Sequence, residues 1–217
     1  MRSENYDKMR NLSLSIIFIL TAFTGVVKGQ NDKLSHLRTQ KKIVTVDKAT
    51  APYYAIQILA LKLPPQEPEF FEKIDAAREF ACVDGYVRYV VGEYETFKAA
   101  AADLSQIQSL GYADAFVVNT AKYNLSASGF SSTNQLVIDP NKTYLVQIGA
   151  FRFPVYLSHF DNVNGVLEFF MKDKIYRYCV GKYQGTEVEG ELNRMKGLGY
   201  KNAFIVEWDK YQSYQIE

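Results

Sequence analysis

Six residues at matching places in two segments of the chain could form a carbohydrate-binding surface. An amide offers donors and an acceptor to sugar hydroxyls and N-acetyl groups, and a guanidinium forms two parallel hydrogen bonds with a carboxylate. A tyrosine ring can cover the apolar face of a sugar while its hydroxyl stays in water. The candidate ligand-binding residues are Gln57, Tyr86, Arg88, Gln147, Ile175 and Arg177.

Simpler explanations exist for the same side chains. A lone outward glutamine is usually only solvated, and an outward arginine beside an aromatic ring is often a packing pair. A duplicated segment also copies its surface residues, so the match between the two sets is weaker support than it looks. Ile175 stands where the first set has Tyr86, so this position of the second set offers no aromatic ring for stacking.

The remaining reactive side chains do not suggest an enzyme. We expect the aspartates to lie at turns, the histidines on the surface or in a polar lead, and neither thiol to have a partner that would activate it. No Cys/His cluster has zinc spacing. The sequence therefore predicts no catalysis, no metal, no cofactor and no disulfide from this set: His36, His159, Cys82, Cys179, Asp84 and Asp173.

Charge and composition exclude several classes of protein. The 217 residues carry 25 Lys and Arg against 24 Asp and Glu, a net charge of +1, so no long-range field would attract nucleic acid. Hydrophobic residues make up 47% of the chain, as in ordinary soluble domains. The 16 tyrosines favour strands.

The N-terminus has the pattern of a secretory signal peptide. Arg2, Lys8 and Arg10 precede an uncharged, mostly apolar stretch at residues 12–27, which is shorter than the roughly 20 residues of a membrane-spanning helix. Small residues at the end of this stretch allow cleavage before Gln30. We therefore expect export without stable membrane insertion after cleavage; the alternative is an uncleaved anchor helix.

Beyond a polar lead, the chain contains the same unit twice. The offset between matching segments drifts only from 90 to 88 residues, which indicates small changes in loop length. The matching pairs are residues 54–61 with 144–151, 86–94 with 175–183, and 110–118 with 198–206.

Each unit reads as strand, helix, strand, strand, helix, strand. Alternating apolar residues predict the strands, and in the first unit helices are expected after Pro68 and near Thr96, the second ending at Gly111. A shorter helix is expected between Pro154 and Gly165. This order predicts an α+β fold in which two helices cover one face of a four-stranded antiparallel sheet and leave the other face open.

The sequence Asp84-Gly85 suggests a two-residue hairpin turn, which determines the register of the strands on either side. Val83 would then lie opposite Tyr86, and Phe80 opposite Tyr89. Arginine is costly beneath a helix, so one set would face outward and the other would face the helices. The outward set is Ala81, Val83, Tyr86 and Arg88, with Gln57 beside them; the inward set is Phe80, Cys82, Val87 and Tyr89.

These patterns divide the chain into six parts. They are a signal peptide at 1–29, a polar lead at 30–50, a first domain at 51–119, an exposed linker at 120–141, a second domain at 142–209 and a tail at 210–217.

The three pairs of matching segments resemble the signature stretches of SPOR domains, the sporulation-related repeats. The resemblance covers most of residues 52–118 and 142–208. It implies two tandem ferredoxin-like or RNP-like units that bind peptidoglycan in the periplasm, with a preference for glycan strands stripped of peptide stems. By their positions in the matching segments, the resemblance implies that the six candidate residues named above face the glycan.

The sequence therefore predicts a non-catalytic protein that binds peptidoglycan through its open sheet faces and serves cell division or maintenance of the envelope. Arg88 and Arg177 would engage the lactyl carboxylates of stem-free muramic acid, and septal cell-envelope proteins are further candidate partners. The alternative is an exported structural or protein-interaction module that uses the same faces to bind a protein partner or a second copy of itself.

Overall fold

A computed structural model describes residues 32–126 and 136–216. The predicted signal peptide at 1–29 and the middle of the predicted linker lie outside these ranges. The described residues form one nine-stranded mixed sheet with three α-helices. The strands are β1 Lys42–Thr45, β2 Tyr54–Leu61, β3 Ala76–Ala81, β4 Val87–Tyr94, β5 Phe116–Asn119, β6 Thr143–Phe151, β7 Val166–Phe170, β8 Tyr176–Gln184 and β9 Phe204–Glu207.

The helices are fewer and shorter than the sequence patterns suggest. The α-helices are α1 Phe97–Ser109, α2 Val188–Gly197 and α3 Trp208–Tyr211, and four 3-10 turns are η1 Pro68–Phe71, η2 Thr120–Lys122, η3 Leu157–Phe160 and η4 Gln212–Tyr214. The prediction of two tandem four-stranded units, each with two helices, is therefore wrong. Only the short turns η1 and η3 stand where the first helix of each unit was expected.

The missing first helices have a local cause. Starting a helix orders several residues for a single hydrogen bond, so a helix needs length to be stable. The stretch after Pro68 is short, because β3 already begins at Ala76, and Ala77 pairs with Ile43 of β1 in the sheet. In the second half β7 begins at Val166, directly after Gly165 at φ +69°.

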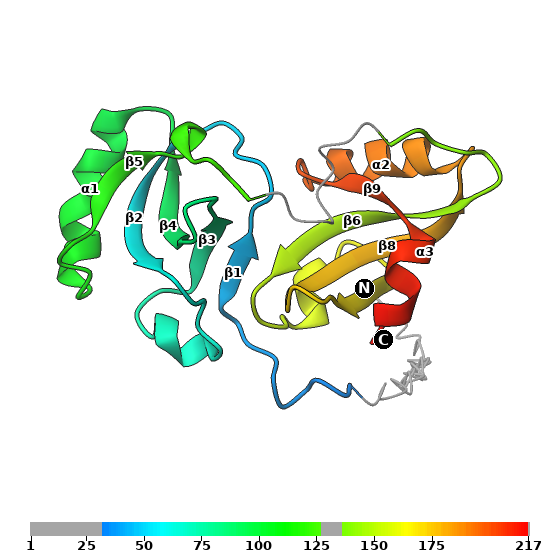
Figure 1. The fold of residues 1–217 in the computed structure, drawn as a ribbon, viewed down its shortest axis with the longest axis horizontal. Helices are drawn as coiled ribbons and strands as arrows, with labels where there is room; N and C mark the ends of the chain where they lie inside the picture. The colour runs from blue at the N-terminus through cyan, green and yellow to red at the C-terminus, as the bar shows by residue number, and fades with distance from the viewer. Residues whose placement is uncertain (1–31, 127–135, 217) are drawn as a thin grey trace, which may run out of the picture. The chain divides into compact units, whose positions relative to one another are not determined.

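The duplication is visible in the order of the strands. In the first half the order is β5-β2-β4-β3, and in the second half it is β9-β6-β8-β7, with antiparallel pairing throughout. The helix α1 packs on β2 and β5, and α2 packs on β6 and β9 (Figure 1). One helix therefore covers one face of each half.

Strand β1 joins the two halves into one sheet. It pairs in parallel with β3 along its whole length and meets β6 at a single residue pair, Val44 with Phe151. The amide of Arg152 also donates to the carbonyl of Ile43. Ile43 is fully buried in the core of the first half. The segment expected to be a polar lead thus supplies the strand that makes the sheet continuous.

The β3–β4 hairpin has a three-residue loop, not the predicted two-residue turn. Gly85 takes φ +81°. The amide of Gly85 donates to the carbonyl of Cys82, and the amide of Cys82 donates to the carbonyl of Tyr86. Phe80 therefore lies opposite Arg88, one residue away from the predicted register. A slip of one residue turns every side chain of a strand to the other face, so the predicted inward placement of Phe80 and Cys82 is wrong.

Strand β4 has the predicted orientation. Tyr89 and Val87 pack in the core beneath α1 with Ile56 and Ile58 of β2. Phe80, Cys82 and Val90 form a separate cluster on the opposite face. Arg88 and Gln57 share this face, as their register with Phe80 and Val90 requires. Both faces of the first half are therefore packed.

Candidate ligand-binding surface

In the first half, the exposed Tyr86 and the half-buried Arg88 form an aromatic and cationic cluster at the end of the β3–β4 hairpin. The Tyr86 side chain is 36% exposed. Its ring centroid lies 5.8 Å from the guanidinium carbon of Arg88 and 6.0 Å from the ammonium of Lys62. A partly exposed ring with two cations near it can contact a sugar ring, and the cations can attract an anionic substituent on that sugar.

The guanidinium of Arg88 is held in place by Asp84. Its two terminal nitrogens donate to the two carboxylate oxygens of Asp84 at 3.0 Å and 2.6 Å. The hydrogen bonds from Arg88, followed by that from the amide of Tyr86, lower the pKa of Asp84 to about 2. Asp84 is therefore charged at neutral pH, and the cluster of Lys62, Asp84 and Arg88 carries a net charge of +1.

Gln57 lies on the same face but is only 8% exposed. Its side-chain oxygen accepts a hydrogen bond of 2.7 Å from the hydroxyl of Tyr123. The ring of Tyr123 also lies 5.6 Å from the guanidinium carbon of Arg88. The structure thus brings Gln57 and Arg88 together through a third residue, which covers the amide.

The corresponding residues of the second half are buried. Gln147 is 3% exposed, Ile175 3% and Arg177 0%. The Gln147 oxygen accepts a hydrogen bond of 2.8 Å from the hydroxyl of Tyr211, and Arg177 donates to both carboxylate oxygens of Asp173. The expectation of an open sheet face is therefore wrong here, because the chain itself covers these side chains.

Two segments, which we call straps, close the faces opposite α1 and α2. The first strap is residues 120–126 and follows β5; the second is residues 208–216 and follows β9. Tyr123 and Tyr211 occupy matching positions in the two straps, at the same 88-residue offset as the strands before them. The sequence signal for the straps is the pair Lys122-Tyr123 and Lys210-Tyr211, which extends the repeat beyond β5 and β9 but does not show that these segments pack on the sheet.

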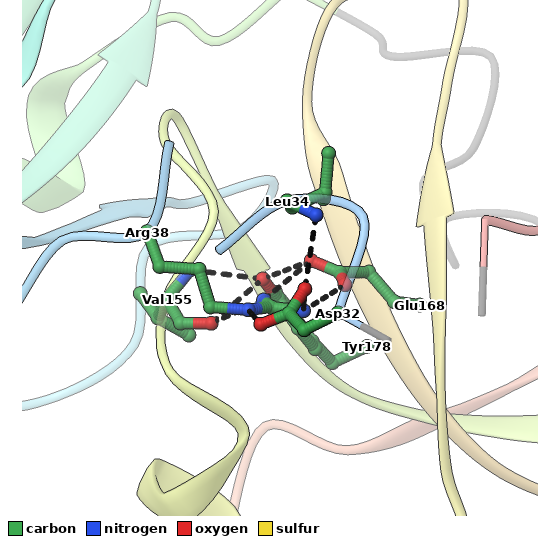
Figure 2. A network of polar contacts seen from close by, with 6 residues as sticks. All are labelled: Asp32, Leu34, Arg38, Val155, Glu168 and Tyr178. Atoms are coloured by element: carbon green, nitrogen blue, oxygen red, sulfur yellow. Dashed lines mark hydrogen bonds and ion pairs between the residues drawn. The ribbon is translucent and has the colours of Figure 1, made fainter. Parts of the chain in front are cut away.

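A buried glutamate is the second feature that recurs in both halves. Glu79 on β3 and Glu168 on β7 each accept a hydrogen bond from a tyrosine on the next strand, Tyr89 and Tyr178. Each also pairs with an arginine from elsewhere in the chain: Arg152 binds Glu79, and Arg38 binds Glu168. Figure 2 shows Arg38 with both carboxylates, of Asp32 and of Glu168, and with the carbonyl of Val155.

This network holds the polar lead against the second half. The Arg38 side chain is 1% exposed and that of Glu168 is fully buried. A buried charge is tolerated only with such partners. Arg38 was not singled out from the sequence, because one arginine in a polar segment carries no pattern that reveals a buried partner far along the chain.

The side chains considered for catalysis do not assemble into a site. His36 is exposed, whereas burial lowers the pKa of His159, which packs against Phe151 and Phe160. Cys82 and Cys179 are both buried thiols, and burial raises the pKa of Cys179. Within residues 32–126 and 136–216, no group of three or more His, Cys, Asp or Glu could hold a metal ion.

A separate groove of about 500 Å³ contains none of the predicted binding residues. It is lined by polar and aromatic side chains that include His36, Thr39, Arg152, Lys174 and the stacked pair of Phe170 and Tyr176. Among the described helices, none combines the length and apolar character needed to cross a membrane.

Comparison with protein-family models, with curated proteins and with solved structures found no match. The likeness of the short motifs to SPOR domains therefore remains a prediction. What the protein binds has to be inferred from the geometry of the surface.

Proposed function

We propose that this chain is a non-catalytic, exported cell-envelope protein whose first half binds peptidoglycan glycan strands. The observation that carries the proposal is the exposed Tyr86 ring with the cations of Lys62 and Arg88 within about 6 Å of its centroid. An aromatic face with adjacent cations suits an amino sugar that bears a carboxylate. The periplasm is the proposed location, with septal envelope proteins as further partners in division or envelope maintenance.

The ligand would make two kinds of contact. A pyranose ring stacks on Tyr86, while Arg88 and Lys62 attract the lactyl carboxylate of a muramic acid residue. That carboxylate is free only where the peptide stem has been removed, which favours stem-free strands. Because Asp84 already holds Arg88 on two oxygens, the arginine is oriented before binding and the ligand shares it with Asp84.

The second half serves as a scaffold in this proposal. Its equivalent residues Ile175 and Arg177 are both almost completely inaccessible. A second glycan site at that place would require displacement of the second strap. One binding half per chain also removes the gain in avidity that two linked sites on one strand would provide.

Retention on purified sacculi tests the proposal. Whole sacculi and sacculi treated with an amidase are each incubated with the wild type and with the Tyr86→Ala and Arg88→Ala variants. Stronger retention of the wild type on treated sacculi, lost in both variants, is expected. The control is Arg194→Ala, because Arg194 is also a surface arginine paired with a carboxylate, Glu191. Equal retention of all proteins on both sacculi would contradict the proposal.

A protein-interaction module is the second candidate. Val83 favours it, because this apolar side chain is 58% exposed in the same turn as Asp84. Sacculi stripped of protein separate the two candidates. Glycan recognition persists on protein-free sacculi, whereas binding to an envelope protein disappears there and returns with untreated envelopes.

A further inference from the structure

The first strap crosses one face of the first half from edge to edge. Its first residue, Thr120, is tied to the carbonyl of Tyr53 by its amide and its hydroxyl. At its far end the amide of Val83 donates to Asn124, and the amide of Ser126 donates to Ala81. The strap thus begins at β5 and ends as a short antiparallel pairing beyond β3.

Between these anchors the strap contacts the groups that a glycan would contact, Gln57 and Arg88. The Tyr123 hydroxyl donates to Gln57 at 2.7 Å, as a sugar hydroxyl would. The Tyr123 ring lies 5.6 Å from the guanidinium carbon of Arg88 and packs edge-on against Phe80. Leu125 joins the same apolar cluster. The strap is therefore an internal occupant of the predicted site.

The second strap has the same course but is more deeply packed. Tyr211 donates to Gln147 and packs edge-on against Phe169, and Gln215 pairs with the β7 edge. Tyr211 is fully buried, whereas Tyr123 and Leu125 are both partly exposed. The second strap also begins with a helical turn, whose Trp208 ring lies 3.7 Å from the ammonium of Lys182.

The size of the buried side chains explains the difference. Leu145 and Met171 lie beneath the second strap at the positions that Ala55 and Cys82 occupy beneath the first. More apolar area is therefore removed from water in the second half, and burial stabilises roughly in proportion to that area. Opening the first strap costs less than opening the second.

We propose that the first strap is a displaceable lid that competes with the glycan for Gln57 and Arg88, and that the second strap is permanently closed. This inference rests on the glycan-binding function proposed above. Only the open fraction of the protein offers Gln57 to the ligand, so the apparent affinity falls in proportion to that fraction. Full recognition then needs the strap to leave, while Tyr86 remains accessible in both states.

A disulfide can lock the strap without altering the rest of the site. Cys82 lies directly opposite Leu125 in an antiparallel bridge. The backbone hydrogen bonds of this bridge are made by the residues on either side, so Cys82 and Leu125 form a non-hydrogen-bonded pair. Such a pair has its Cα atoms about 4.5 Å apart, within the range for a disulfide. Leu125→Cys treated with diamide should therefore crosslink to Cys82. Cys179 is fully buried in the other half and does not compete.

Retention on amidase-treated sacculi is measured for the oxidised and the reduced Leu125→Cys protein. Oxidation is expected to lower retention about tenfold or more, since the competent fraction is removed, and a reductant should restore it. Leu125→Cys combined with Cys82→Ser is the control that cannot form the crosslink. Tyr123→Ala is expected to raise retention. Equal retention of the oxidised and reduced forms would overturn the lid while leaving glycan binding intact.

If no form of the protein binds sacculi, the glycan-binding function is rejected, but opening of the strap is not yet tested. A second measurement therefore tests opening of the strap without a ligand. Opening of the strap exposes the Cys82 thiol, so in the native wild type a thiol reagent should label Cys82 much faster than Cys179. Tyr123→Ala should accelerate the labelling of Cys82 further. Labelling of both thiols at one slow rate, unchanged by Tyr123→Ala, would show that the strap does not open and would overturn the inference.

Discussion

Removing the Arg38 guanidinium should destabilise the protein strongly, although Arg38 lies in a segment whose composition suggests a solvated lead. In Arg38→Met, Glu168 keeps the hydrogen bond from Tyr178 but loses its cationic partner. Glu168 has no exposed surface, so water cannot replace the arginine. Removal of one partner from a buried ion pair typically lowers the free energy of unfolding by about 3–5 kcal/mol.

The structure also predicts how related variants should rank. Glu168→Gln removes the charge but leaves Asp32 as a carboxylate partner for Arg38, so a smaller loss of about 1–3 kcal/mol is expected. The double variant Arg38→Met with Glu168→Met leaves neither charge of the buried pair and should lose less stability than the sum of the losses in Arg38→Met alone and Glu168→Met alone.

Urea unfolding is the assay, followed by far-ultraviolet circular dichroism and by the fluorescence of Trp208, the single tryptophan. For a chain of this size, 1 kcal/mol corresponds to about 2–4 °C in the melting temperature. Arg194→Met, at an exposed ion pair, is the matched control and should change stability by less than about 1 kcal/mol. A loss below about 1 kcal/mol in Arg38→Met would refute the reasoning about the buried pair.

Tyr211→Phe removes the hydrogen bond to a buried amide oxygen and should cost about 1–3 kcal/mol in urea unfolding; an unchanged midpoint would mean that the second strap does not depend on this bond. The hydrogen bond from Arg38 holds the pKa of Asp32 below its usual 3.8. The Asp32 carboxylate therefore stabilises the fold at neutral pH, and this stabilisation is lost as acid protonates the carboxylate. Below about pH 4, the melting temperature should fall more steeply in the wild type than in Asp32→Asn. Lys174 has φ +59°, where the first half has Gly85, so Lys174→Gly should raise the melting temperature or leave it unchanged, in contrast to the loss expected for Gly85→Lys.

The repeat and most of its strands could be predicted from the sequence, because alternation and an almost constant offset are local signals. The outward orientation of Arg88 also followed correctly, since a guanidinium is costly beneath a helix. Phe80 and Cys82 were placed on the wrong face because Asp84-Gly85 is compatible with either a two-residue or a three-residue hairpin loop. One added loop residue was enough to reverse the faces of β3.

The continuity of the sheet and the closure of its faces could not be predicted by the same means. Four residues of β1 are a weak strand signal inside a polar segment, and their pairing with β3 is a long-range property. The straps follow strands that already complete the expected unit, so Tyr123 lies in the expected linker and Tyr211 in the expected tail. The burial of Gln147 and Arg177 follows from the second strap and could not be inferred from their own neighbourhoods.

The most direct test of the central claim is a chemical-shift map of the protein with a stem-free glycan fragment. Shift changes are expected at Tyr86 and Arg88, together with changes along the first strap, while the second strap and Arg177 stay unchanged. Changes confined to the second half, or at α1 and α2 on the opposite faces, would contradict it.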